Sequence, residues 1–154
     1  MKHRLKQAAV VVVVLLLAIQ LVPLARTNPP VTREIRWDSP ETRALADRAC
    51  LDCHSNRTTW PWYSHVAPAS MLVVDHVTEG RRHLNFSEWD RPNAKFDDVE
   101  QNVRDGEMPI SNYLWMHHEA RLTAAETARL LSGLRATFAA DPPIPRPKRP
   151  DRSH

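Results

Sequence analysis

The chain has 154 residues, including two cysteines, and this length suffices for one domain with appendages. Its formal net charge of +3 lies at the two ends, because residues 1–26 carry +4, residues 141–154 carry +2 and residues 27–140 are left with −3. The chain therefore lacks the basic folded domain that nucleic-acid binding requires, and no nucleic-acid partner is expected.

The first predicted element is an apolar segment, residues 8–25, which follows three basic residues and is interrupted only by Gln20 and Pro23. It is either a secretory signal peptide or a membrane anchor. Pro23 departs from the small-x-small pattern of a cleavage site, and the length falls within the range of about 17 to 25 residues that spans a bilayer. The sequence therefore predicts an N-terminal signal-anchor or transmembrane helix within residues 1–26. By the positive-inside rule, a single-pass protein of the bacterial inner membrane would then carry its C-terminal domain in the periplasm.

Residues 27–38 contain two consecutive prolines and are predicted to form an extended tether. A folded domain is expected over residues 39–140. Its first helix is predicted to begin with Ser39 as the N-cap and Pro40 at the first helical position, and a short apolar stripe on this helix leads into Cys50.

The segment Cys50-Leu-Asp-Cys53-His54 contains both cysteines and matches the CxxCH signature of c-type haem attachment. Two thiols on one helical turn can reach the vinyl edge of a porphyrin, and His54 is then the proximal iron ligand. A disulfide, a redox CxxC and half of a zinc site are the alternatives. Zinc would need two further ligands, and no βαβ pattern of a thioredoxin-like protein is visible. The spacing predicts haem c linked covalently through two thioethers.

Three further elements follow the motif. Trp60-Pro61-Trp62-Tyr63 is predicted to be a loop that either shields one haem edge or forms a separate hydrophobic cluster. Residues 68–84 carry an amphipathic helical stripe. Residues 96–105 are predicted to form a third helix that stops at Gly106.

Met108 lies in the loop after this third helix and is followed by Pro109. A methionine held in such a loop is well placed to bind iron from the side opposite His54, so Met108 is the predicted distal ligand. His83, His117 and His118 are the rival ligands. An open sixth position is the remaining alternative, and it would replace electron transfer by ligand binding.

The last helix has the clearest local signal, because Thr123 and Glu126 form a capping box ahead of an apolar stripe. This helix is expected to pack across the first helix of the domain. Residues 141–154 are rich in proline and arginine, and a disordered tail is predicted there.

These residues together resemble the bacterial haem-binding domain family with a single CxxCH, a relative of the monohaem cytochrome c fold. The matching segments are Cys50-Leu-Asp-Cys-His-Ser-Asn, Trp60-Pro-Trp-Tyr-Ser, Gly80-Arg-Arg-His-Leu-Asn-Phe-Ser-Glu-Trp89, Gly106-Glu-Met-Pro109 and residues 113–121. The resemblance implies an all-α, cytochrome c-like domain around a covalent haem. It also implies that Met108-Pro109 corresponds to the pair that supplies the distal thioether in cytochrome c relatives. The segment around His83 has no counterpart in ordinary small cytochromes, which keeps His83 open as a second functional residue.

The leading hypothesis is a membrane-anchored periplasmic single-electron carrier with His54 and Met108 as axial ligands, which exchanges electrons with redox partner proteins at the inner membrane. Such a protein needs no catalytic acid or base, and the sequence favours it over an enzyme. The second hypothesis is a haem-based sensor or enzyme with an open or labile distal site. The third is a scaffold without haem, with a disulfide between Cys50 and Cys53.

Overall fold

The computed structural model describes residues 1–146 of the protein, which form seven α-helices, two 3-10 helices and one pair of short parallel strands. The α-helices are α1 (Lys2–Ile19), α2 (Pro40–Ala49), α3 (Leu51–His54), α4 (Ala69–His83), α5 (Phe96–Arg104), α6 (Tyr113–Met116) and α7 (Ala124–Ala140). The 3-10 helices are η1 (Trp62–His65) and η2 (His118–Ala120), and the strands are β1 (Pro92–Asn93) and β2 (Ile144–Pro145). The chain is therefore mostly helical, as predicted.

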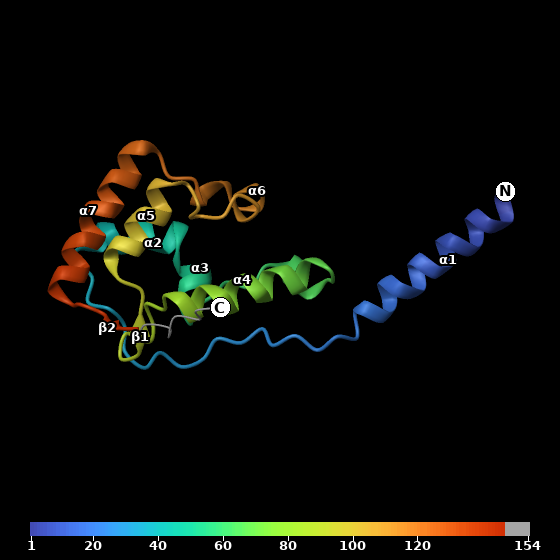
Figure 1. The fold of residues 1–154 in the computed structure, drawn as a ribbon, viewed down its shortest axis with the longest axis horizontal. Coiled ribbons are helices and arrows are strands. Elements are labelled where there is room, and N and C mark those ends of the chain that lie inside the picture. Colours follow the sequence, from blue (N-terminus) through green and yellow to red (C-terminus); the bar gives the residue numbers. More distant parts are fainter. Residues whose placement is uncertain (147–154) are drawn as a thin grey trace, which may run out of the picture.

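The prediction of an N-terminal transmembrane helix is wrong. Within residues 1–146, every helix is too short or too polar to cross a bilayer. The helix α1 ends at Ile19, so its apolar part after the basic residues is about 12 residues, or roughly 18 Å, against about 30 Å of hydrocarbon. The localisation that depended on this helix, a single-pass protein of the bacterial inner membrane, is wrong for the same reason. Figure 1 shows α1 standing apart from the other helices.

Gln20, the residue at the C-terminal end of α1, connects this helix to the rest of the chain. Its side-chain Nε2 donates to the Ala67 carbonyl at 3.1 Å, and its Oε1 accepts from the Ala67 amide at 2.9 Å. The same Nε2 lies 2.9 Å from the Leu16 carbonyl and so caps the last turn. Downstream, the predicted tether includes Ile35, which is buried in the core.

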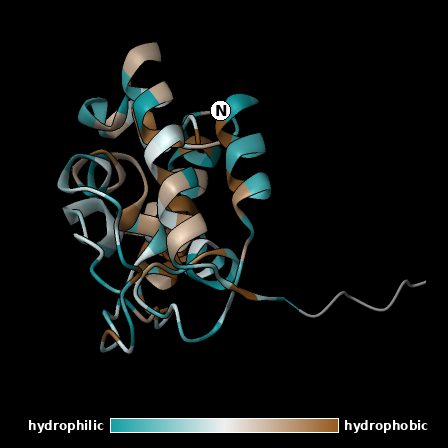
Figure 2. Cartoon of the chain, turned by 90° about the vertical axis from the view of Figure 1, so that its left-hand side faces the viewer, coloured by the Kyte–Doolittle hydropathy of each residue, from teal (hydrophilic) through white to brown (hydrophobic). Residues whose placement is uncertain are grey.

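The hydrophobic core lies where α2 and α7 cross (Figure 1). This crossing confirms the prediction that the last helix packs across the first helix of the domain, which is α2. The crossing is close, because a Cβ atom on Gly133 would lie 1.9 Å from Oγ1 of Thr42. Trp89 is fully buried there. The buried apolar residues of this core are Ile35, Leu45, Ala46, Leu51, Leu84, Phe86, Trp89, Leu130, Leu134 and Phe138. Figure 2 shows that the helices around the core carry both hydrophilic and hydrophobic residues, as amphipathic packing requires.

The predicted helix ends are confirmed by their capping bonds. Ser39 accepts a hydrogen bond from the Thr42 amide at 3.1 Å ahead of Pro40. Thr123 and Glu126 form both bonds of the capping box. Gly106 has a φ of 73°, the left-handed conformation that favours glycine after a helix.

The chain returns to the core after α7. Asp141 is buried, and β2 pairs in parallel with β1. The predicted disordered tail begins at residue 141, and its part from residue 147 onward lies outside the described residues.

Candidate functional site

The CxxCH segment forms one tight turn. Cys50 ends α2 and begins α3, and its carbonyl accepts from the Cys53 amide at 3.2 Å and the His54 amide at 2.9 Å. Both cysteines are free thiols. Burial, followed by the charge of Cys53, raises the pKa of Cys50 to about 12, and burial followed by the charge of Asp52 raises the pKa of Cys53 to about 11. Redox CxxC motifs work through a lowered thiol pKa, so these values disfavour thiol exchange chemistry.

The His54 imidazole is oriented by backbone carbonyls. Its Nδ1 lies 3.1 Å from the Gly80 carbonyl and 3.0 Å from the Leu84 carbonyl, so Nδ1 carries the proton and donates. Burial lowers the pKa of His54, although these two backbone hydrogen bonds oppose the effect, and the ring is therefore neutral near pH 7. A neutral imidazole with Nδ1 as donor leaves the Nε2 lone pair for a metal.

The end of α4 holds this turn in place. A Cβ atom on Gly80 would lie 2.6 Å from the Cys53 carbonyl oxygen, so only glycine permits the contact between α4 and α3. Arg81 donates to the Ser55 carbonyl at 2.7 Å and to Oγ1 of Thr58 at 2.8 Å. Sequence reasoning gave Gly80 no role. The signal it missed was a lone glycine in the last turn of an otherwise regular helix.

A cavity of about 350 Å³ opens beside Cys53, with walls from α3, η1, α4 and α6. Most of its lining side chains are apolar or aromatic, including Leu72, Val77 and Ile110. Trp62 and Trp115 also line it, although 73% and 69% of their surfaces are exposed. This volume is within the range of about 300 to 1,000 Å³ for cofactor and ligand pockets.

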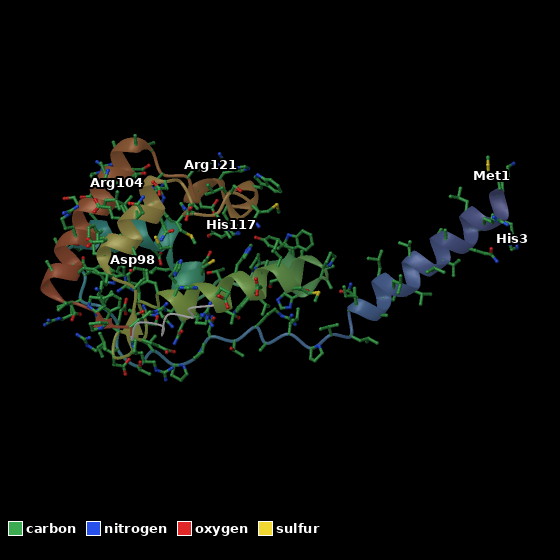
Figure 3. All side chains as sticks on the ribbon, in the orientation of Figure 1. Met1, His3, Asp98, Arg104, His117 and Arg121 are labelled. Carbon is green, nitrogen blue, oxygen red and sulfur yellow. The ribbon has the colours of Figure 1, made fainter. Side chains whose placement is uncertain are left out.

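One side of the cavity carries linked polar groups. The Tyr63 hydroxyl and His117 Nε2 are 2.7 Å apart, and His117 Nδ1 is 3.1 Å from Glu119. The Tyr113 ring stacks on the His117 ring with centroids 4.1 Å apart, and its hydroxyl donates to Asp52 at 2.9 Å. Figure 3 labels His117, which lies on the side of α6 that faces α4.

The predicted distal ligand lies outside this lining. Met108 occupies the turn between α5 and α6, its amide donates to the Asn102 carbonyl at 3.1 Å, and 39% of its surface is exposed. Ile110, two residues later, does line the cavity. The histidines and methionine of the lining are His76, His117 and Met116. The structure therefore brings Cys50, Cys53 and His54 together on one turn, of which Cys53 lines the cavity, and leaves Met108 two residues before the lining residue Ile110.

The rival His83 lies at the end of α4, where it neighbours Glu79, Arg82 and Arg146. It does not line the cavity. His118, the remaining rival, is exposed on η2. In the described residues 1–146, no three His, Cys, Asp or Glu side chains gather as a metal site, which the zinc alternative would need.

A larger cavity of about 600 Å³ lies between α5 and α7 and is separate from the CxxCH turn. Its charged lining residues pair with one another, because Glu100 contacts both Arg104 and Arg135 at 2.8 Å. It contains no cysteine, histidine or methionine. The smaller cavity is therefore the candidate site.

Two comparisons return no match: one with curated proteins and one with solved structures. A comparison with protein families does find a match. A family model described as a haem-binding domain matches residues 14–136, which include the CxxCH turn and every wall of the candidate cavity.

Proposed function

Because the chain belongs to the haem-binding domain family and is therefore a haem-binding protein, we propose that it holds haem c covalently and transfers single electrons between redox partner proteins. Cys50 and Cys53 would form the two thioethers, and His54 would be the proximal iron ligand. Met108 is the distal ligand in this proposal.

The observation that carries this proposal is the state of His54. Its Nδ1 donates to two backbone carbonyls, at 3.1 and 3.0 Å, and its Nε2 is left as a metal-binding atom on the same turn as two free thiols. Histidines that bind metals are held in this way, with the second ring nitrogen donating to a carbonyl or carboxylate. Neither a structural disulfide nor a motif for thiol–disulfide exchange requires an imidazole held in this orientation.

The residues around the turn fit a porphyrin. The cavity beside Cys53 has a mainly apolar lining, and the exposed rings of Trp62 and Trp115 at its edge are available to cover an apolar ligand. When bound, haem supplies one-electron cycling between ferric and ferrous iron. The apolar side chains would limit the access of water to the haem and so favour ferrous over ferric iron, because the ferrous haem carries the lower charge. The Gly80 and Leu84 carbonyls that accept from His54 would tune the basicity of this ligand.

A haem-based sensor or enzyme is the second candidate. The observation in its favour is that Met108 is outside the cavity lining, whereas His117 and the Tyr63 hydroxyl are part of it. These groups could support a ligand bound at an open sixth position. Carbon monoxide separates the two candidates. The electron carrier, with both axial positions occupied, takes up carbon monoxide slowly after reduction, and fast stoichiometric uptake would favour the sensor or enzyme.

Covalent attachment is tested by expression in cells with competent cytochrome c maturation, followed by a haem-stained denaturing gel. The wild-type band should stain, because only a thioether-linked cofactor remains with the denatured chain. The Cys50→Ala,Cys53→Ala double variant is the matched control and should not stain. A colourless wild-type band with normal protein stain would refute the proposal.

A further inference from the structure

The short helix α6 is not held in place by burial. None of its four residues is buried, and Trp115 and Met116 are exposed. A four-residue helix without a buried side chain needs other interactions to keep one conformation, because ordering its residues costs conformational entropy. The position of α6 over the cavity must therefore depend on specific side-chain contacts.

Three contacts supply this connection: two join the segment to other parts of the chain, and one links the two residues that make those contacts. The Tyr113 hydroxyl donates to Oδ2 of Asp52 at 2.9 Å, which links α6 to the CxxCH turn. The rings of Tyr113 and His117 stack with an interplanar angle of 11°. His117 Nε2 lies 2.7 Å from the Tyr63 hydroxyl, which links the same segment to η1. We call Asp52, Tyr63, Tyr113 and His117 the tyrosine–histidine bridge.

The polar ends of the bridge are well satisfied. Oδ1 of Asp52 accepts from the Thr59 amide at 3.0 Å, so both carboxylate oxygens have donors. His117 Nδ1 faces Glu119 at 3.1 Å. Burial and the charge of Asp52 raise the pKa of Tyr113, which therefore stays protonated and remains a donor. Hydrogen bonds to a charged group are stronger than those between neutral groups. The hydrogen bond from Tyr113 to the Asp52 carboxylate is therefore the strongest contact of the bridge.

We propose that Tyr113 and His117 are positioning residues of the haem site: they hold the segment of residues 108–117 over the cavity, and this placement keeps exogenous ligands from the sixth coordination position. The inference rests on the proposed haem function. The bridge reaches the haem site in two ways: Asp52 lies inside the CxxCH motif, and Tyr113 follows Met108 after a short connection. Removing the bridge takes away the hydrogen bonds that join this segment to α3 and η1.

Two measurements on the haem-loaded protein test this inference. The first is the rate at which carbon monoxide binds after reduction. The second is hydrogen exchange of the amides of residues 113–120, which does not involve the iron. We expect Tyr113→Phe, which keeps the ring and removes the hydroxyl, to raise the carbon monoxide rate at least tenfold and to raise exchange in this segment similarly. Tenfold corresponds to about 1.4 kcal/mol.

A double-mutant comparison makes the test specific. If Asp52 and Tyr113 act only through each other, Asp52→Asn combined with Tyr113→Phe should change both readouts no more than the larger single substitution. Thr32→Val is the matched control, because it removes a hydroxyl that donates to Asp90 at 2.5 Å, outside the cavity lining. It should leave both readouts unchanged.

The possible failures can be told apart. A wild-type protein without covalent haem refutes the proposed function, and hydrogen exchange in the haem-free chain still tests the bridge. A loaded Tyr113→Phe variant with the wild-type carbon monoxide rate refutes the positioning role, even if its thermal stability falls. Additive effects of Asp52→Asn and Tyr113→Phe would also overturn the proposed link.

Discussion

The His54 ring owes its orientation to one helix end, because both carbonyls that accept from its Nδ1 belong to Gly80 and Leu84. The Gly80 carbonyl also accepts from the Leu84 amide at 2.9 Å. The geometry of the proposed iron ligand therefore depends on how closely α4 approaches α3.

Gly80→Ala should disturb this approach. The added methyl group would lie 2.6 Å from the Cys53 carbonyl oxygen and 3.1 Å from the Cys53 Cβ atom, so the helices must separate. We expect a loss of about 1 to 3 kcal/mol in the free energy of unfolding and a lower yield of haem-loaded protein. Urea denaturation and haem content measure the two effects. Thr78→Ala, exposed on the same helix, is the control and should be nearly neutral. A fully stable, fully loaded Gly80→Ala protein would show that the close contact is unimportant.

Met108 and Met116 give a second pair of variants at this scale. If Met108 binds the iron, Met108→Ala abolishes the thioether-to-ferric-iron absorption band and leaves haem attached through Cys50 and Cys53. Met116 lines the cavity, and Met116→Ala should leave the band intact. Optical spectra of the oxidised variants measure both outcomes. The assignment of Met108 is wrong if the band is absent from the wild type or is lost only in the Met116 variant.

The sequence predicts how residues close together in the chain are arranged, but it does not predict which residues far apart in the chain contact one another. The CxxCH spacing placed two thiols and His54 on one turn, as the structure has them. It could not identify Gly80 or Leu84 as partners of His54, because backbone carbonyls carry no side-chain signal. Tyr63 and His117 are 54 positions apart, so their hydrogen bond depends on the tertiary arrangement of η1 and α6.

Individual helices were predicted best where their ends are specified by local hydrogen bonds. The capping box of α7 and the N-cap of α2 are examples, since a side chain and a backbone amide three residues away decide both. The N-terminal helix was predicted worst. Its apolar stretch continues to residue 25 in the sequence, whereas in the structure the Gln20 side chain caps the last turn and donates to the Ala67 carbonyl. Pro23 also disfavours helix at the residue before it.

Removing the N-cap of α7 tests the contribution of its capping box. In Thr123→Ala the Glu126 amide loses its acceptor at 3.2 Å, and one side-chain partner of the Glu126 carboxylate is lost as well. We expect the free energy of unfolding to fall by about 1 kcal/mol. Chemical denaturation measures it, and Ser132→Ala, exposed on the same helix, serves as the control. Equal stabilities of the two variants would contradict a capping role.

At the scale of the whole molecule, Asp141 joins the two ends of the domain. Its Oδ1 accepts from the Arg33 guanidinium at 2.5 Å, and its Oδ2 accepts from the Arg36 amide at 3.0 Å. Its backbone carbonyl accepts from the Trp89 indole at 3.0 Å. Partners 105 and 108 positions away in sequence cannot be recognised from local patterns, which is why the sequence places Asp141 in the predicted tail.

Asp141 also makes stability depend on pH. Burial alone would raise the pKa of Asp141, but the hydrogen bonds from the Arg36 amide and the Arg33 guanidinium outweigh it and hold the pKa below its usual value. The unfolded chain therefore binds the proton more readily, and the stabilisation is present at neutral pH and lost as the pH falls below about 4.

Asp141→Asn should accordingly lower the free energy of unfolding by about 1 to 3 kcal/mol at pH 7. The difference from the wild type should shrink as the pH falls below about 4, where the wild-type carboxylate becomes protonated. Denaturation curves at several pH values measure this, with Asp47→Asn, at an exposed position on α2, as the control. A difference that is constant across this range would mean that the charge of Asp141 is not its source.

The proposed function requires that both sulfur atoms of the CxxCH turn are bonded to haem. The most direct measurement is the mass of the proteolytic peptide that contains residues 50–54, taken from protein matured in cells that assemble c-type cytochromes. We expect a single peptide that is heavier by one haem, with both Cys50 and Cys53 unreactive toward thiol reagents. A peptide of unmodified mass, with two thiols that react, would contradict it.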